Sequence, residues 1–263
     1  MKQSTLPHNP KAPLNFLALI PARFASTRFP GKPLAILGGK PIVQRVYERA
    51  TLVFEEVCVA TDDERIFTAV EAFGGRAVMT SAEHRSGTDR CEEAYRLLGS
   101  TADVVVNIQG DEPFIAPEQL RTVRSAFDDS RTEIATLVKP FSPDCRFEDI
   151  ANPNSPKVVV DSQDFALYFS RSVIPFLRGV PETEWPARHT FLKHIGLYAY
   201  RADVLKKIAA LPQSSLETAE SLEQLRWLQA GYKIKVGQTD TETIGIDTPD
   251  DLKRAEQFLN GRL

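Results

Sequence analysis

Residues 15–32, NFLALIPARFASTRFPGK, join a short apolar run to a cationic loop. The apolar run, residues 15–20, ends at a proline and is typical of a buried strand. The loop that follows contains Arg23, Arg28 and Lys32 and no acidic residue. In open parallel sheets, ligands bind beyond the carboxyl ends of the strands, where this loop falls. Because arginine offers forked donors to phosphate oxygens and lysine offers a point charge, the loop predicts a polyphosphate site.

A solvated basic loop is the alternative interpretation, but Pro30, Gly31 and Pro33 fix the course of the backbone, which favours a binding loop. A Walker A site needs GxxxxGK followed by Ser or Thr, whereas Lys32 precedes a proline and GGKP at 38–41 fails in the same way. No GxGxxG follows the first strand. The sequence therefore disfavours a P-loop NTPase and a dinucleotide oxidoreductase.

Strand-like and helix-like segments alternate outward from this first strand. Pattern predicts strands at 55–61, 77–79 and 103–109, and helices at 41–50, 63–73 and from Thr88 onward. Four strand-and-helix units predict an α/β fold, with a mostly parallel central sheet and helices on both faces, as in Rossmann-like proteins.

The pattern changes in the middle of the chain. Three strand-like strings, KVVVD, FALYFSR and LKHIGLYAY, follow one another without full crossover helices. Residues 140–201 are therefore expected to form an antiparallel insert or dimer arm. After it we expect helices at 202–210 and 216–230, a strand at 233–237 and a last helix from Pro249.

Composition limits the function classes. The chain has 263 residues, 42% of them hydrophobic, and a formal net charge of -3, which argues against a nucleic-acid-coating protein. Its three cysteines contain no CxxC pair, and no apolar stretch approaches the length of a membrane span, so a reducing cytoplasmic compartment and no membrane partner are expected. We expect residues 1–14 to form a flexible tail and residues 15–263 a single domain.

A carboxylate follows another predicted strand, in NIQGDEP at 107–113. This strand runs into Gly110 and Asp111, which places the Asp111 carboxylate at the same sheet edge as the cationic loop. Carboxylates beside phosphate sites usually bind magnesium, which takes both kinds of oxygen. A simple turn is the alternative.

The third motif is GIDTPDDLKRAEQFL, residues 245–259. Thr248 suits a helix N-cap, Pro249 the first helical position, and Asp251 the partner position of a capping box. Asp247 is not needed for helix initiation, so it is free to share a metal ion with Asp111. A spare turn aspartate is the alternative.

Seven strings, in order over residues 15–258, together resemble the 3-deoxy-manno-octulosonate cytidylyltransferase family, the CMP-Kdo synthetases. They are PARFASTRFPGKPL, EHRSGTDR, NIQGDEP, ALYFSR, KHIGLYAY, LEQLR and GIDTPDDL. The resemblance implies a nucleotide-diphospho-sugar transferase-like fold and a magnesium-dependent homodimer. It also implies coupling of CTP to the eight-carbon acid sugar Kdo, with release of pyrophosphate, for lipopolysaccharide biosynthesis.

The resemblance also assigns residues to roles. It implies that catalysis involves Arg23, Lys32, Asp111 and Asp247, with the two aspartates as magnesium ligands. It implies that the nucleotide contacts Ala22, Arg23, Arg28, Lys32, Ser86, Gly87 and Arg90. It implies that the sugar contacts Gln109, Arg171, His194, Tyr198, Glu223 and Gln224.

Chemistry is consistent with part of the sugar set. Kdo has one carboxylate and many hydroxyls, so one arginine, Arg171 by the resemblance, and several polar groups suit it. His194 and Tyr198 share a strand face by the period of two. They could instead be a satisfied strand histidine and a core aromatic. Glu223 is chosen by resemblance, because acidic residues at every third position can simply be the wet side of a helix.

In the expected mechanism the C2 hydroxyl of Kdo attacks the α-phosphorus of CTP in line. The protein mainly positions the two reactants and neutralises their negative charge. A sialic-acid cytidylyltransferase is the nearest rival, although such enzymes usually lack FPGKPL after the first strand. A noncatalytic nucleotide-binding homologue is disfavoured by the retained aspartates and Lys32. The choice between Kdo and 8-amino-Kdo, and between lipopolysaccharide and capsule, stays open.

Overall fold

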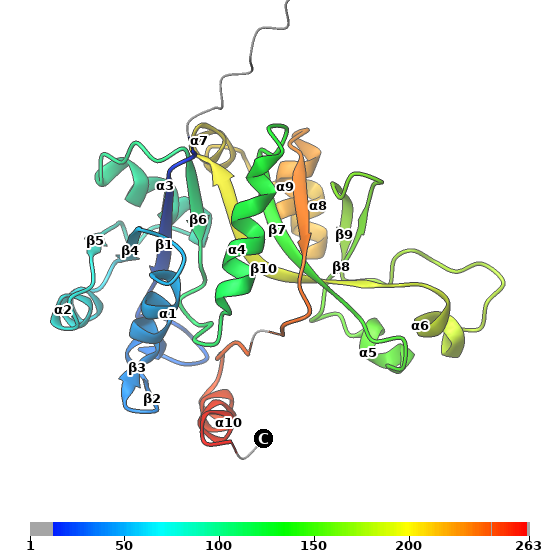
Figure 1. Ribbon diagram of the computed structural model, residues 1–263, viewed down its shortest axis with the longest axis horizontal. Coiled ribbons are helices and arrows are strands. Elements are labelled where there is room, and N and C mark those ends of the chain that lie inside the picture. Colours follow the sequence, from blue (N-terminus) through cyan, green and yellow to red (C-terminus); the bar gives the residue numbers. More distant parts are fainter. Residues whose placement is uncertain (1–12, 243, 262–263) are drawn as a thin grey trace, which may run out of the picture.

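The structure is a computed structural model that describes residues 13–242 and 244–261. Its central strands run in the order β11 (Ile234–Gln238), β7 (Ile134–Pro140), β10 (Leu192–Arg201), β6 (Val104–Asn107), β1 (Phe16–Ala22), β4 (Glu56–Thr61) and β5 (Ala77–Met79) (Figure 1). The pairs β1–β4, β1–β6, β4–β5 and β7–β11 are parallel, and β10 is antiparallel to both β6 and β7. The predicted mostly parallel sheet is confirmed.

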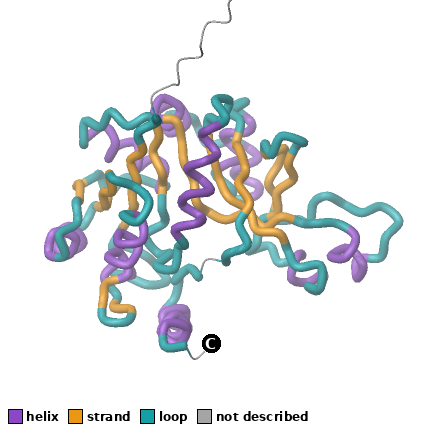
Figure 2. The backbone as a smooth tube through the Cα atoms, viewed as in Figure 1, coloured by secondary structure: helices purple, strands orange, loops and turns teal. Residues whose placement is uncertain are grey.

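Helices cover both faces of this sheet, as the sequence predicted (Figure 2). Along β1, Leu17 and Leu19 point to one core cluster, whereas Ala18 and Ile20 point to the other. Helices α3 (Gly87–Leu97), α7 (Ala202–Ala209) and α9 (Gln224–Gln229) cover the first cluster, and α1 (Ile42–Ala50), α2 (Glu64–Ala72) and α4 (Pro117–Ser125) cover the second. Burial on both sides explains why the strand reads as a continuous apolar run.

Most predicted elements are found within a few residues of their expected bounds. Pro41 is the N-cap of α1 rather than its first helical residue. The predicted strand at 103–109 ends earlier, at Asn107, so Gln109 belongs to the following loop. The two glycines of the GGKP string, Gly38 and Gly39, form the turn between β2 (Ile36–Leu37) and β3 (Lys40–Pro41) and have φ angles of 53° and 78°. Such left-handed angles are readily adopted by glycine, which accounts for the pair in a hairpin turn.

The middle region forms an arm that extends from the main body (Figure 1). It comprises α5 (Phe147–Ala151), β8 (Lys157–Val160), β9 (Ala166–Ser170), the short 3-10 helix η3 (Glu182–Glu184) and α6 (Trp185–Arg188). Trp185 and Phe191 pack with Ile150 in a separate apolar cluster that includes Phe147. Residues 178–189, which matched no motif, therefore supply Trp185 to the core of the arm.

One strand of the expected insert belongs to the main sheet. The second half of β10 lies between β6 and β7, where Tyr198 pairs with Asn107 and Tyr200 with Val105. Only its first half pairs with β8. The expectation that residues 140–201 form an insert is corrected here, because β10 is long enough to join the arm to the centre of the sheet.

The helix expected at 216–230 is two helices, α8 (Ser215–Glu220) and α9. Ser221 between them has a left-handed backbone, with φ 50°. Glu220 accepts hydrogen bonds from the Ser170 hydroxyl and the Arg171 amide, and the Arg171 guanidinium donates to the carbonyls of Glu220 and Ser221. Contacts from β9 thus stabilise the end of α8, and the prediction of one continuous helix was wrong.

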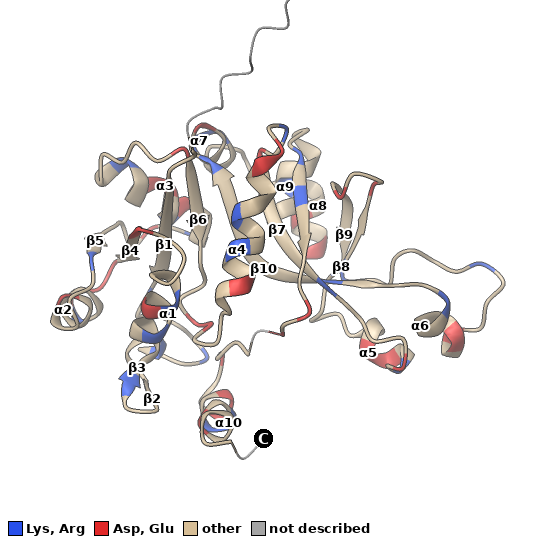
Figure 3. Cartoon of the chain, viewed as in Figure 1, with Lys and Arg blue, Asp and Glu red and all other residues tan. Residues whose placement is uncertain are grey.

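The last helix, α10 (Pro249–Leu259), begins as predicted, with Thr248 as N-cap and Asp251 completing a capping box. The remaining elements are the 3-10 helices η1 (Lys32–Leu34) and η2 (Ala126–Asp128). Leu14, from the segment expected to be a tail, packs against the core, and residues 1–12 lie outside the described residues. Basic and acidic residues are interspersed over the elements (Figure 3). Among the described residues, no helix is long and apolar enough to cross a membrane.

Candidate active site

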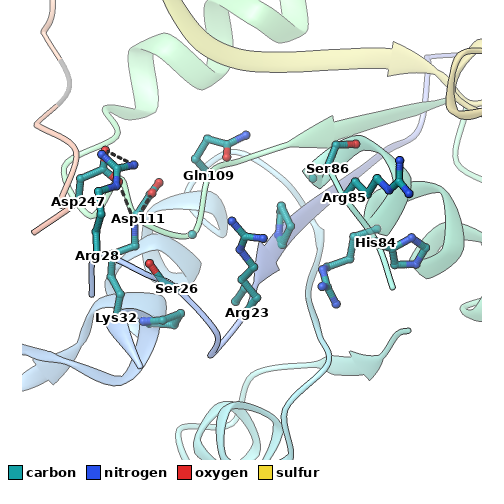
Figure 4. A pocket seen from close by; sticks show the side chains of 16 residues that line it. Arg23, Ser26, Arg28, Lys32, His84, Arg85, Ser86, Gln109, Asp111 and Asp247 are labelled. Carbon is teal, nitrogen blue, oxygen red and sulfur yellow. Dashed lines mark hydrogen bonds and ion pairs between the residues drawn. The ribbon is translucent and has the colours of Figure 1, made fainter. Parts of the chain in front are cut away.

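The cationic loop, the carboxyl end of β6 and the start of α3 surround one cavity of about 240 Å³ (Figure 4). The predicted nucleotide residues Ala22, Arg23, Arg28, Lys32, Ser86, Gly87 and Arg90 all line it, as do Gln109, Asp111 and Asp247. These residues come from four separate parts of the sequence. The structure therefore brings together every predicted nucleotide, metal and catalytic residue, and one predicted sugar residue.

The carboxyl ends of β1 and β6 approach each other closely, which brings the site residues that follow these strands together. A Cβ atom on Gly110 would lie 2.7 Å from the carbonyl oxygen of Pro21, a separation that real Cβ atoms do not show. Gly110 lets the chain after β6 pass against the chain after β1, which brings Asp111 to the cationic loop.

Lys32 lies between the two predicted metal ligands. Its Nζ atom is 2.6 Å from Oδ2 of Asp111 and 3.1 Å from Oδ1 of Asp247, and its side chain is 13% exposed. Arg28 lies 3.2 Å from Oδ2 of Asp247. Four charged groups thus form one cluster at the cavity wall, and the two carboxylates are close enough to share a single cation (Figure 4).

Backbone contacts fix the position of Asp247. The Ile246 amide donates to the Asp111 carbonyl at 2.9 Å, which joins the two acidic segments. Asp251 accepts from the Thr248 amide and hydroxyl, so the capping box is complete without the Asp247 carboxylate. The side chain of Asp247 is therefore not needed by the helix cap, as the sequence predicted, and it faces Lys32.

Glu112 was not selected from the sequence, although it stands in NIQGDEP. Desolvation, with a further contribution from Asp111, raises the pKa of the Glu112 carboxyl to about 8. Its Oε2 atom has no hydrogen-bond partner among the described residues. Since a carboxyl with this pKa is mostly protonated at neutral pH, Glu112 adds little negative charge to the cluster.

The start of α3 forms the opposite wall of the cavity. Ser86 is its N-cap and accepts a hydrogen bond from the Asp89 amide at 3.2 Å. The positive end of an 11-residue helix therefore faces the same cavity as the cationic loop. Arg23 and Arg85 line the cavity and form no ion pair with the residues described, so both guanidinium groups can bind an anion.

Arg90 has a different environment from the other cationic residues. It is buried, and its guanidinium donates to Oδ2 of Asp62 at 2.8 Å and to the Thr80 hydroxyl at 2.6 Å. Sequence reasoning missed Asp62 because it lies on a distant segment. It also missed His84, which lines the cavity and pairs with Glu93 at 2.6 Å, although EHRSGTDR had pointed to this stretch.

The sugar-side predictions have mixed outcomes. Gln109 lines the first cavity. His194, Tyr198 and Gln224 line neither this cavity nor a second one beside it, which is lined by Glu223. His194 and Tyr198 do share one face, with ring centroids 5.4 Å apart. Desolvation lowers the pKa of His194 to about 4, and its Nε2 atom lies 3.1 Å from the Thr136 hydroxyl.

Buried polar atoms without partners mark the region behind these residues. The Tyr198 hydroxyl and the Gln224 Nε2 atom are buried and have no hydrogen-bond partner in the part of the chain that the structure describes. Burial also raises the pKa of Tyr198 well above its ordinary value. Unpaired buried polar groups are costly, and they occur where a polar ligand or water completes the network.

Glu223 connects this region to the start of α3. Its carboxylate accepts from the Thr88 hydroxyl at 2.9 Å and from Arg226 at 2.7 Å, and burial raises its pKa. Glu223 also lines a second cavity of about 660 Å³, which shares Arg85 and Ser86 with the first. A sugar bound there would lie beside the first cavity.

Arg171 lies outside the linings of both cavities. Its guanidinium donates to three backbone carbonyls, those of Glu220 at 2.6 Å, Pro153 at 2.8 Å and Ser221 at 3.2 Å. These contacts join the arm to the break between α8 and α9. Its predicted contact with the sugar carboxylate stays a prediction.

The acidic pair suits magnesium. Asp111 and Asp247 offer carboxylate oxygens, the ligands that Mg²⁺ prefers, and both already lie around one cationic group, the Lys32 ammonium. Among the described residues no cluster of three or more His, Cys, Asp or Glu side chains could hold a metal. Two protein ligands fit an ion that also takes oxygens from water and phosphate.

Comparison with known proteins gives consistent matches. Residues 17–234 match the model of a family described as Cytidylyltransferase. A 3-deoxy-manno-octulosonate cytidylyltransferase of Parabacteroides distasonis is 64% identical over 250 residues, covering 95% of this chain and 100% of the relative. One from Thermodesulfovibrio yellowstonii is 49% identical, covering 93% of this chain and 98% of the relative.

Solved structures agree. A CMP:2-keto-3-deoxy-manno-octonic acid synthetase complexed with CTP has a TM-score of 0.86 and 44% identity, covering 95% of this chain and 100% of that one. A putative glucose-1-phosphate thymidylyltransferase from Bacillus anthracis has a TM-score of 0.62 at 16% identity, covering 92% of this chain and 94% of that one, and shares the fold alone.

Proposed function

This chain belongs to the family of 3-deoxy-manno-octulosonate cytidylyltransferases, and we propose that it couples CTP with Kdo to give CMP-Kdo and pyrophosphate. The observation that carries the proposal is the assembly of Lys32, Asp111 and Asp247 at one cavity of a chain that is 64% identical to such an enzyme over nearly its full length.

The nucleotide side of the reaction follows from the charges of the cavity. Arg23 and Arg85 have no ion-pair partner in the described ranges, and the N-terminus of α3 adds a third site of positive potential. The 44% identical synthetase was solved with CTP, which supports a triphosphate in the corresponding cavity of this chain.

In the proposed reaction, the C2 hydroxyl oxygen of Kdo attacks the α-phosphorus of CTP. The bond from this phosphorus to the oxygen that bridges the α- and β-phosphates breaks, pyrophosphate leaves with that oxygen, and the hydroxyl proton passes to solvent. Arg23 and Lys32 would neutralise charge that grows on the leaving group, and Gln109 lies where it can orient the reacting groups. No covalent intermediate with the protein is required.

We propose magnesium as the cofactor, with Asp111 and Asp247 as its protein ligands. When bound, the ion would offset repulsion between the anionic reactants. Lys32 would then leave the carboxylates and bind phosphate. Its side chain is 13% exposed and already lines the cavity.

We also propose a cytoplasmic homodimer that supplies lipopolysaccharide biosynthesis. Support for the dimer comes from the arm, on which Phe176 is 72% exposed and Leu167 is 61% exposed. Exposed apolar side chains on a projecting segment are typical of interaction surfaces. Sedimentation of the protein beside a Phe176→Ser variant tests this assignment, since a monomeric parent protein would contradict it.

Pyrophosphate release tests the proposed activity. The protein is assayed with each of the four nucleoside triphosphates against Kdo, 8-amino-Kdo and sialic acid, with and without magnesium. We expect turnover with CTP and Kdo in the presence of magnesium. A preference for sialic acid, or no turnover with any pair, would overturn the proposal.

A further inference from the structure

Phe24 lies near the start of the cationic loop and contacts two neighbours, Arg65 and Gly31. The Cζ atom of Arg65, at the start of α2, lies 3.4 Å from the centroid of the Phe24 ring. Gly31 closes the loop, because its amide donates to the Phe24 carbonyl at 2.9 Å. A Cβ atom on Gly31 would lie 2.9 Å from the ring, so the glycine backbone rests against the ring edge.

Arg65 is itself fixed in position. Its Nε and Nη2 atoms donate to the two carboxylate oxygens of Asp63, at 2.9 and 2.7 Å. Asp63 is the N-cap of α2 and also accepts from the Arg65 amide at 3.0 Å. The guanidinium plane is therefore anchored to a helix start and covers the Phe24 ring from a fixed point.

These contacts have little value for overall stability. The Arg65 side chain is 61% exposed, and ion pairs at such positions contribute little to the free energy of unfolding. Their effect is on the loop, because residues between Phe24 and Gly31 include Arg28, with Arg23 just before and Lys32 just after. Arg65 does not line the cavity.

We propose that Arg65 is a positioning residue for the nucleotide, which acts by stacking on Phe24 and holding the cationic loop in its binding conformation before the triphosphate arrives. The inference rests on the proposed function. A loop that is ordered in advance does not lose conformational freedom on binding, so the ligand binds more tightly. The expected signature is a change in the KM for CTP without a change in kcat.

The chain provides a matched control. Arg131 makes the same fork with Asp129, through Nε at 3.0 Å and Nη2 at 2.7 Å, and its Cζ atom lies 5.4 Å from the centroid of the Phe165 ring. Arg131 lines none of the cavities described above. Arg131→Ala therefore removes the same motif at a place without a predicted ligand.

Two measurements test the proposal in the full-length protein. The first is the rate of trypsin cleavage after Arg23 and Arg28 without substrate, followed by mass spectrometry, which reports loop order independently of activity. The second is steady-state kinetics with CTP and Kdo. We expect Arg65→Ala to speed cleavage and to raise the KM for CTP about two- to fivefold, the size of one exposed cation–π contact. The kcat, the KM for Kdo and the Tm should stay unchanged.

Further variants sharpen the result. Phe24→Leu should give the same change in the KM for CTP, and Arg65→Ala should add nothing in that background, because the two residues act through one contact. Arg65→Lys keeps the charge but not the fork, so it should restore only part of the parental KM.

The proposal is overturned if the rate of trypsin cleavage in Arg65→Ala equals that of the parent protein. It is also overturned if Arg131→Ala speeds cleavage of the loop as much as Arg65→Ala does. Faster cleavage with an unchanged KM for CTP shows a brace that does not position the nucleotide, and also overturns it. If the parent protein does not use CTP, the proposed function fails instead, and the trypsin measurement still decides whether Arg65 holds the loop.

Discussion

Replacing Lys32 by methionine separates two effects of its ammonium group. In the free protein this group neutralises Asp111 and Asp247, at 2.6 and 3.1 Å, and so lies between the two carboxylates proposed as magnesium ligands. In the proposed reaction it binds the leaving phosphates. Lys32→Met should therefore tighten binding of magnesium to the free protein while lowering turnover, because a competitor and a catalytic charge are lost together.

The geometry sets the expected size of both effects. Two unit charges 4 Å apart interact by about 4 kcal/mol at an effective dielectric constant of 20. Asp247 is 48% exposed, so solvent screens much of this interaction. We therefore expect magnesium to bind about tenfold more tightly, which corresponds to about 1.4 kcal/mol. Loss of a charged hydrogen bond in the transition state should lower kcat about tenfold to a hundredfold, with a smaller change in the KM for CTP.

Isothermal titration of magnesium into the nucleotide-free protein gives the first quantity, and pyrophosphate release gives the second. Lys40→Met is the matched control, because Lys40 pairs with Glu48 at 2.8 Å on the neighbouring hairpin, outside the cavity. Magnesium affinity that stays equal or falls in Lys32→Met would refute the competition argument. A change confined to the KM for CTP would make Lys32 a binding residue only.

Three other predictions concern the remaining site residues. Asp111→Asn and Asp247→Asn should each nearly abolish turnover and weaken magnesium binding while the Tm changes little, and near-normal rates at saturating magnesium would reject the metal assignment. Arg171→Lys should raise the KM for Kdo about tenfold to a hundredfold, since lysine keeps the charge but cannot make a forked pair with a planar carboxylate. If Arg171 only braces the arm through its three carbonyl contacts, the KM for Kdo stays unchanged and the Tm falls, which would remove it from the sugar site. His194 should favour the folded state as the neutral form: its lowered pKa, about 4, means that stability is present above pH 6.5 and lost as pH falls toward 4. Urea denaturation at pH 4.5 and 7 should show a weaker pH dependence in His194→Gln, and identical dependence would contradict the assignment.

The sequence allowed prediction of the nucleotide side because its information is local. The strand at 15–20 and the strings at 107–113 and 245–252 each place a charged residue where an element begins or ends. Once the sheet is parallel, the ends of neighbouring strands meet at one edge, so the loops that contain Lys32 and Asp111 are expected at the same edge. Arg90 shows the limit of this reasoning, because the resemblance placed it at the nucleotide, and no local string indicated the ion pair that it forms with Asp62.

The sugar side depends on contacts that no local pattern contains. Glu217, Glu220 and Glu223 recur every third residue, so periodicity predicts one helix with an acidic exposed stripe. Glu220 instead bonds the Ser170 hydroxyl and the Arg171 amide, 49 to 50 residues away, and the helix ends there. Since Ser221 takes a left-handed conformation, the chain turns before Glu223, and that carboxylate reaches Thr88, 135 residues distant in sequence. The resemblance could therefore single out Glu223 as a site residue. Its contact with Thr88 follows only from the tertiary contacts that end α8 and turn the chain.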